Sequence, residues 1–424
     1  MSIELEELTR AQLAVLGREW LLHGHLQDRV GMPLVHTGRT REEMEAIAIE
    51  EWMAASPVYS LRTQRAMNFG NGDVPTILKN IQIDIGAPPH FMDFRSRVED
   101  ANHGEFWLAH CGALLDVEPM GEEYVHGMCH AIEDPTFDAT AGATNARAQV
   151  RPLHRPPRVP AGREPHCHWT VIIDPAYPPV EAHPYRWIVE QSKIATVATA
   201  EPFASGSGAE AEPGGWDDYS GDFDPDFELE DLSHRALVTV LQEVAVQSHL
   251  LIRGFAVAVA QRYGEETALD LLPQIFTGLA GMTAQRLVPV LELEARDAND
   301  IARLLELHPM FWPRTYVDLR VEVVDDQHLR FAFGPSPVLE EADGFTWFSQ
   351  LGAASDRALD SIVQAVNPRA SCQPAATRGD ERFAYDVTID PDAKPAPEAR
   401  EIALAKISGG AAFVFTPRRA VRRD

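Results

Sequence analysis

An internal duplication constrains the fold of this chain more than any other feature of its sequence. Residues 8–31 align with residues 232–255, and a Glu, a His and an Arg recur at the same places. Three later windows align in the same order at nearly the same offset: 91–119 with 316–344, 134–152 with 356–374, and 166–175 with 382–391. Ordered self-similarity of this kind is typical of repeats. The sequence therefore predicts two homologous repeats, residues 1–198 and 232–424, that pair as an intramolecular pseudodimer.

A segment of different composition separates the two repeats. Residues 199–231 are rich in Gly, Ser, Pro and acidic residues and contain few aliphatic ones. Such a segment buries too little apolar area to offset the entropy lost on ordering. We therefore expect an acidic, flexible linker between the repeats.

The same succession of periodicities in both repeats predicts an α+β fold. Thr9 and Ser233 stand where an N-cap precedes an amphipathic helix. Two further helical zones follow in each repeat, and the hydrophobic period then changes to the alternation of strands. In the first repeat this predicts a hairpin, a helix that begins at Asp134, and two more strands near 147–154 and 167–174. Helices followed by a small antiparallel sheet with one inserted helix make an α+β unit.

Composition and charge narrow the possible partners. The chain has 424 residues and a formal net charge of −27 at pH 7, whereas nucleic acids and anionic membranes require Lys and Arg partners for their phosphates. The N-terminal residues are acidic and lack an apolar signal core, and no apolar run approaches the length of a membrane span. We therefore expect a cytoplasmic protein that binds a small molecule, binds neither nucleic acid nor membrane, and could form a homodimer.

The two repeats differ in the residues that carry chemistry. Of the 16 histidines, 12 lie at or before residue 183 and only 4 after residue 231. His154 aligns with Ala376, and Cys167 aligns with Phe383. Thiols and imidazoles left unpaired in a core cost free energy, so a repeat without a function should lose them. This asymmetry predicts one working site, in the first repeat.

The candidate metal ligands of the first repeat are thiols and imidazoles near strand ends. Alternation along 165–174 places His168 on one face of a strand and Cys167 on the other. His154 ends the strand that should pair with it and could face Cys167 across the hairpin mouth. His126 and His130 share one face of a helix. Zinc or iron would suit such ligands, and the predicted set is Cys129, His130, His154, Cys167 and His168.

A site without a metal is the alternative reading of the same residues. Cys129 or Cys167 would then be the nucleophile, with His154 or His130 as its base. Arg151 and Arg155, in a Pro-rich connection, could hold a substrate carboxylate through paired hydrogen bonds, with Trp169 beside them. The plain alternatives are a solvated loop for the arginines and simple packing for the cysteines.

Three short stretches carry a family resemblance. "GEFWLAHCGAL", "YVHGMCHAIEDP" and "PHCHWTV" together resemble the L-2-amino-thiazoline-4-carboxylic acid hydrolase-like family and are similar to the related 4-vinyl reductase domain. The resemblance covers about residues 90–175 and, more faintly, 315–391. It implies small-molecule binding, and in some members zinc held by cysteines and a carboxylate, with Cys129 as the early and Cys167 as the late cysteine. The Glu-x-x-Cys of the family is missing, and Arg151 and His154 stand in its place.

Three functions follow from this sequence analysis. The first is a metal- or thiol-dependent hydrolase that acts on a small polar or heterocyclic carboxylate, with one active site in the first repeat. The second is a sensor-like protein that binds a small molecule without catalysis and uses the metal for stability. The third is a scaffold whose acidic linker docks a partner.

Overall fold

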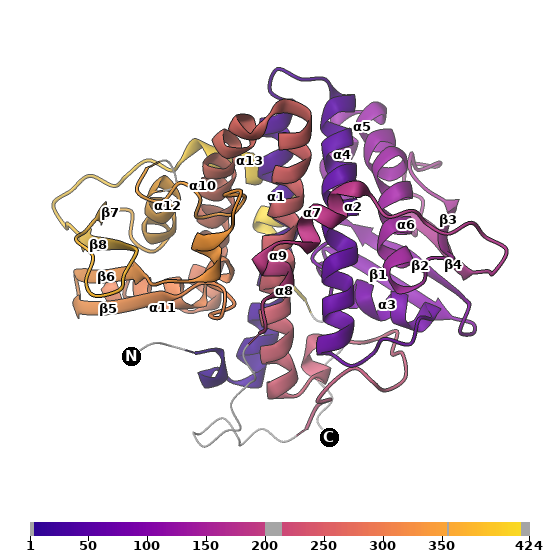
Figure 1. The fold of residues 1–424 in the computed structure, drawn as a ribbon, viewed down its shortest axis with the longest axis horizontal. Helices are drawn as coiled ribbons and strands as arrows, with labels where there is room; N and C mark the ends of the chain where they lie inside the picture. Colours follow the sequence, from indigo (N-terminus) through magenta and orange to yellow (C-terminus); the bar gives the residue numbers. More distant parts are fainter. Residues whose placement is uncertain (1–3, 200–213, 354–355, 417–424) are drawn as a thin grey trace.

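Four long helices form the centre of the molecule, and a small sheet lies on either side of them (Figure 1). The computed structural model describes residues 4–199, 214–353 and 356–416. The central helices are α1 (Arg10–His36), α2 (Arg41–Ala66), α9 (His234–Tyr263) and α10 (Glu265–Val290). They pack across the halves, α2 on α9 and α1 on both α9 and α10. The predicted α+β class is confirmed.

After the two long helices, both halves continue with a helix, two strands, a helix, two strands and a helical end, whereas α4 and α5 belong to the first half alone among the described residues. The first half continues with α3 (Val74–Gln82), β1 (Met92–Val98), β2 (His103–Cys111), α4 (Gly112–Val117), α5 (Glu122–His126), α6 (Glu133–Thr144), β3 (Ala148–His154), β4 (Cys167–Ile173), α7 (Pro184–Glu190) and α8 (Lys193–Thr196). The second half continues with α11 (Ala298–Leu307), β5 (Leu319–Asp325), β6 (His328–Phe333), α12 (Asp356–Val366), β7 (Ala370–Pro374), β8 (Phe383–Ile389) and α13 (Arg400–Ala405).

Each half contains one antiparallel sheet of four strands. The strand orders are β1-β2-β4-β3 and β5-β6-β8-β7, so the same topology occurs twice. Burial alternates along β4, where Cys167, Trp169 and Val171 are buried. Helix α6 covers this inner face, because its Phe137 packs on Trp169 with ring centroids 5.1 Å apart. The inserted helix thus closes the core of the first half, as the periodicity predicts.

The helix ends are partly as predicted. Thr9 and Ser233 cap α1 and α9 with their side chains, which confirms both N-caps. The helix before β3 does not begin at Asp134, because α5 continues through the π-helix Gly127–Ile132 (η3) into α6. A π-turn shifts the hydrogen-bond pattern by one residue, so the proline that follows it does not force a new helix.

The segment between the halves differs from the flexible linker that its composition predicts. Residues 200–213 lie outside the described residues, whereas residues 214–231 pack on the first half. The Tyr219 side chain is 1% exposed and stacks on Phe227 at 4.9 Å. Lys79 donates to the carbonyl of Tyr219 at 2.8 Å. Four aromatic residues in an otherwise polar stretch, Trp216, Tyr219, Phe223 and Phe227, therefore supply enough buried area to fix its second part.

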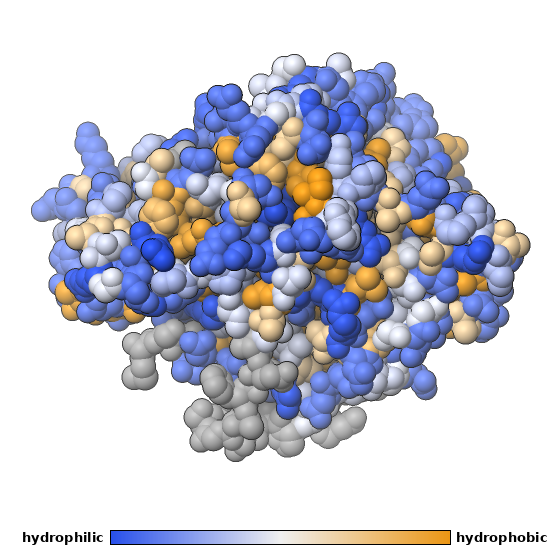
Figure 2. Space-filling view, viewed as in Figure 1, coloured by the Kyte–Doolittle hydropathy of each residue, from blue (hydrophilic) through white to orange (hydrophobic). Residues whose placement is uncertain are grey.

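Among the described residues, one helix is long and apolar enough to span a membrane. This helix is α9, and 94% of its most apolar 18-residue window is buried inside the protein. It therefore packs as a core helix. Apolar residues on the face shown in Figure 2 form small separate patches among polar ones.

Two buried ion pairs join the halves in a reciprocal way. Arg62 of α2 donates to Glu243 of α9 at 2.9 and 3.1 Å, and Arg286 of α10 donates to Glu19 of α1 at 2.7 and 2.9 Å. Each pair joins the second helix of one half to the first helix of the other. The arginines, like the glutamates, are 224 residues apart in the sequence.

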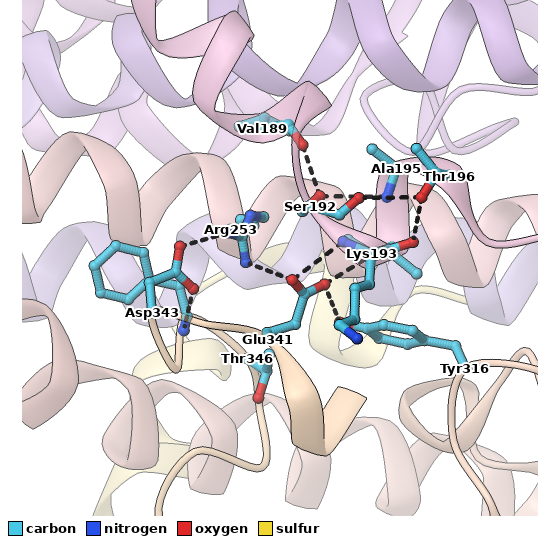
Figure 3. Close-up of polar contacts among 12 residues, drawn as sticks. Val189, Ser192, Lys193, Ala195, Thr196, Arg253, Tyr316, Glu341, Asp343 and Thr346 are labelled. Carbon is cyan, nitrogen blue, oxygen red and sulfur yellow. Dashed lines mark hydrogen bonds and ion pairs between the residues drawn. The ribbon is translucent and has the colours of Figure 1, made fainter. Parts of the chain in front are cut away.

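The segments that follow each sheet also cross to the opposite half. The backbone N–H groups of Lys193 and Ile194 donate to Glu341 at 3.1 and 3.0 Å (Figure 3). On the other side, the Ser408 hydroxyl and the Gly409 N–H donate to Asp116 at 2.6 and 2.8 Å. In each half, a carboxylate after the second strand of the sheet therefore accepts hydrogen bonds from the C-terminal segment of the other half.

Candidate functional site

A cavity of about 430 Å³ lies in the first half, between α1, α2, β1, α4, η3 and α6. This volume is in the range of small-molecule sites. Its walls are mostly aliphatic, methionine and aromatic side chains, and Leu404 and Ile407 of the second half close one side. The side chains of Met120 and Ile407 are 52% and 70% exposed, so the cavity reaches the surface beside them.

A pair of carboxyl groups lies at the wall that α1 and α2 form, where Asp28 lines the cavity and Glu51 is fully buried without lining it. Asp28 lines the cavity and accepts from the Trp52 indole at 2.9 Å, and Gln27 donates to Glu51 at 2.6 Å. Burial raises the pKa of Glu51 well above its ordinary value, and the charge of Asp28 raises it further. Burial also raises the pKa of Asp28, which its hydrogen bond with Trp52 and the charge of Arg29 oppose. The second oxygen of each group, Asp28 Oδ1 and Glu51 Oε2, has no hydrogen-bond partner among the described residues.

Asp84 adds a third carboxyl group to the same wall. The Tyr59 hydroxyl donates to it at 3.0 Å and the Gly86 N–H at 2.7 Å. Burial raises the pKa of Asp84 to about 6, although both hydrogen bonds lower it. Asp28 and Glu51 also act on the Tyr59 hydroxyl, so these acids form one electrostatic group. Carboxyl groups with pKa values near neutrality are typical of functional sites.

Glu133 lies on a separate wall, directly after the π-helix. Its side chain is 9% exposed, and its Oε2 atom has no hydrogen-bond partner among the described residues. Burial raises its pKa to about 8, Arg155 lowers it and Asp134 raises it. The π-turn matters because such turns are frequent at functional sites and re-aim the side chains that follow.

The basic side chain of Arg29 lies on the cavity wall and already has hydrogen-bond partners within the protein. It donates to Asp116 at 2.8 Å and to His25 Nε2 at 3.2 Å. Burial lowers the pKa of His25 well below its ordinary value, and Arg29 lowers it further. His25 is therefore neutral, and the ionisable side chains of this cavity are predominantly acidic.

The second half has apolar side chains where the first half has these acids. At an offset of 224 residues, Ile252 stands opposite Asp28 in the alignment and Ile275 opposite Glu51, and both isoleucines are fully buried. Phe276, which aligns with Trp52, packs against Trp347 with ring centroids 5.8 Å apart. Aromatic and aliphatic side chains therefore fill the corresponding region. The predicted asymmetry is present, but acids rather than thiols and imidazoles mark it.

The structure brings the predicted cysteines together on the inner face of the sheet. Cys129 lies on η3 and Cys167 on β4, and both are buried. Burial raises the pKa of the Cys129 thiol strongly, and the nearby Glu133, Cys111 and Cys167 raise it further. Burial also raises the pKa of Cys167 well above its ordinary value. Both groups are therefore neutral thiols, which are poor nucleophiles.

The predicted histidines lie on the other face of the sheet. His154 pairs with His168 rather than with Cys167, because the register shifts between Pro152 and His154. A shift of one residue moves a side chain to the opposite face, so the His154 and His168 rings lie 6.1 Å apart and away from the thiols. His130 is elsewhere again and shares a hydrogen bond of 2.7 Å with the carbonyl of Pro156.

The predicted metal set therefore does not fit a single ion as arranged. The sheet separates Cys129 and Cys167 from His154 and His168. In the described ranges, no group of three His, Cys, Asp or Glu side chains is placed to hold a metal ion.

The predicted substrate-binding residues have other partners. Arg151 pairs with Asp138 at 2.8 Å, and Arg155 pairs with Asp134. Trp169 is fully buried in the core and is not exposed to the cavity wall that the structure shows. These ion pairs tie Arg151 of β3, and Arg155 directly after β3, to helix α6.

The sequence contained a signal for the acids that sequence reasoning overlooked. Asp28 and Glu51 interrupt apolar helix faces, and the aligned positions of the second half are both isoleucine. Comparing carboxylates between the halves, in addition to His and Cys, would have identified them.

No family model matches the chain, and no curated protein or solved structure shows significant similarity to it.

Proposed function

We propose that this protein binds a small, largely apolar molecule in the cavity of the first half. The single observation that carries the proposal is a cavity of about 430 Å³ whose apolar walls hold the carboxyl groups of Asp28, Asp84 and Glu133. Apolar walls with a few convergent polar groups are typical of ligand sites. A buried carboxyl group costs stability, so its presence on such a wall suggests a role in binding.

The proposal also assigns different roles to two homologous halves, binding to the first and stabilisation to the second. The reciprocal ion pairs Arg62–Glu243 and Arg286–Glu19, and the repeated strand order, support a pseudodimer of related repeats. In this proposal the first half binds the ligand, and the second half stabilises it and closes one side of the cavity with Ile407. The protein is cytoplasmic in this proposal and binds neither nucleic acid nor membrane.

Uptake of a neutral apolar fluorophore tests the binding function. N-phenyl-1-naphthylamine should bind the purified protein with one site and increased emission. The variant Ala48→Phe places a ring at a buried cavity position and should abolish that uptake. The control Ala176→Phe adds the same ring at an exposed turn and should bind as the parent does. Equal uptake by all three proteins would contradict the proposal.

A thiol- or metal-dependent hydrolase is the second candidate. Glu133 lies near Cys111, Cys129 and Cys167, since its charge acts on all three thiols. A carboxylate beside a thiol can accept its proton, and this proximity is the observation that favours the thiol version. The resemblance to the L-2-amino-thiazoline-4-carboxylic acid hydrolase-like family stays a prediction that points the same way. Elemental analysis for zinc and iron, on protein purified without added metal, tests the metal version. Loss of turnover in Cys129→Ser with unchanged melting would support the thiol version.

A further inference from the structure

We propose that the ligand is an organic cation, a protonated amine on an apolar body, and that Glu133 is its anchor. This inference rests on the proposed binding function and names its ligand class. It is carried by the carboxyl groups of the cavity, by the unpartnered oxygen of Glu133 and by the aromatic walls.

The balance of charge in the cavity favours a cation. Asp28, Asp84 and Glu133 contribute carboxyl groups from three different elements. Arg29 is paired with Asp116 at 2.8 Å. His25 is paired with Arg29, and His36 is the basic side chain of the described wall whose Nδ1 atom has no hydrogen-bond partner. An anionic ligand would therefore meet more carboxyl groups than free basic groups there, and this repulsion is strong at low dielectric.

Glu133 is the carboxyl group that gains most from a ligand. Asp84 already accepts hydrogen bonds from Tyr59 and the Gly86 backbone, and Asp28 accepts one from Trp52 through Oδ2, although Asp28 Oδ1 has no partner among the described residues. The Oε2 atom of Glu133 accepts none among the described residues, although the residue is buried. A buried acceptor without a donor carries a desolvation penalty that an ammonium N–H would remove. Such a charge-assisted hydrogen bond is also stronger than a neutral one.

The walls suit the remainder of such a molecule. Trp52, Phe94, Tyr124 and Phe137 line the cavity together with several methionine side chains. Aromatic faces attract cations, and methionine adapts its shape to apolar groups. The same cavity therefore offers an acidic anchor, cation-attracting rings and an apolar volume.

Three compounds of one shape test the class. 4-tert-Butylbenzylamine, 4-tert-butylbenzyl alcohol and 4-tert-butylbenzoate share the apolar body and differ in charge. By isothermal titration at pH 8.5, where Glu133 is largely ionised, we expect the amine to bind at least about 10-fold more tightly than the alcohol, and the benzoate to bind most weakly. Equal affinity for amine and alcohol, or a preference for the benzoate, would overturn the inference that the ligand is a cation. The proposal that the cavity binds a small molecule would still stand. Failure of all three compounds together with N-phenyl-1-naphthylamine would instead overturn the proposed function itself.

Two variants test the anchor. Glu133→Gln keeps the shape and a neutral acceptor but removes the charge, so the amine should lose its advantage over the alcohol. Alcohol binding should stay unchanged, which shows that the variant is folded. The control Glu123→Gln removes an exposed carboxyl group from the same helical run and should retain the advantage. An amine preference that survives in Glu133→Gln would overturn the role of Glu133.

Discussion

The replacement Glu133→Gln should stabilise the protein, and the gain should grow with pH. Burial raises the pKa of Glu133 from an ordinary 4.5 to about 8. Since the folded state holds the proton more tightly than the unfolded state, folding becomes less favourable as pH rises from 4.5 to about 8. Glutamine cannot ionise, so the variant does not carry this cost.

The size of the effect follows from the same two pKa values. A pKa difference of one unit between the folded and the unfolded state corresponds to about 1.4 kcal/mol of stability for a single group. The free energy of unfolding of the variant should therefore exceed that of the parent by less than about 1 kcal/mol at pH 5, about 3 kcal/mol at pH 7 and about 5 kcal/mol above pH 8. Arg155 and Asp134, and the thiols of Cys111, Cys129 and Cys167, face the same carboxyl group and are unchanged in the comparison.

Urea unfolding at pH 5, 7 and 8.5 measures this difference. The exposed control Glu123→Gln should match the parent at each pH. A constant difference between parent and Glu133→Gln across these pH values, or a less stable variant at pH 8.5, would refute the reasoning. The expected combination of higher stability and weaker amine binding is the trade-off typical of functional sites.

The remaining predictions concern packing, pairing and thiol chemistry. Tyr219→Ala should lower the free energy of unfolding by about 3–5 kcal/mol, because the ring is buried, and proteolysis should then cut within 214–231; resistance equal to the parent would contradict this packing. Arg62→Met should cost about 3–5 kcal/mol by leaving Glu243 buried without a partner, and adding Glu243→Leu should recover most of it in urea unfolding; a double variant as unstable as the single one would contradict the pairing. Cys129 and Cys167 should react with a disulfide reagent at pH 8 only after unfolding, because burial raises both thiol pKa values; rapid reaction of the folded protein would point to an activated thiol.

Local patterns in the sequence determined the elements. The N-caps at Thr9 and Ser233, the change of period before the hairpins and the order of helices and strands are confirmed, because they depend on interactions between near neighbours in the chain. The alternation along β4 also placed Cys167 and His168 on opposite faces, as observed. Composition alone was a poorer guide for 214–231, where a few aromatic residues outweigh a polar average.

The site depended on features that periodicity does not reveal. The irregular register between Pro152 and His154 placed His154 opposite His168, and this single step separated the predicted ligands across the sheet. Asp28, Asp84 and Glu133 are far apart in the sequence and converge only because helices of one half, a π-turn and a segment of the other half enclose one volume. The sequence by itself determined the α+β order of elements, because periodicity and caps depend on near neighbours in the chain. It also showed which residue types differ between the two halves, because the halves can be aligned without a structure. Only the tertiary structure decided which residues face the cavity, because a cavity and the pKa values on its walls arise from long-range packing and burial.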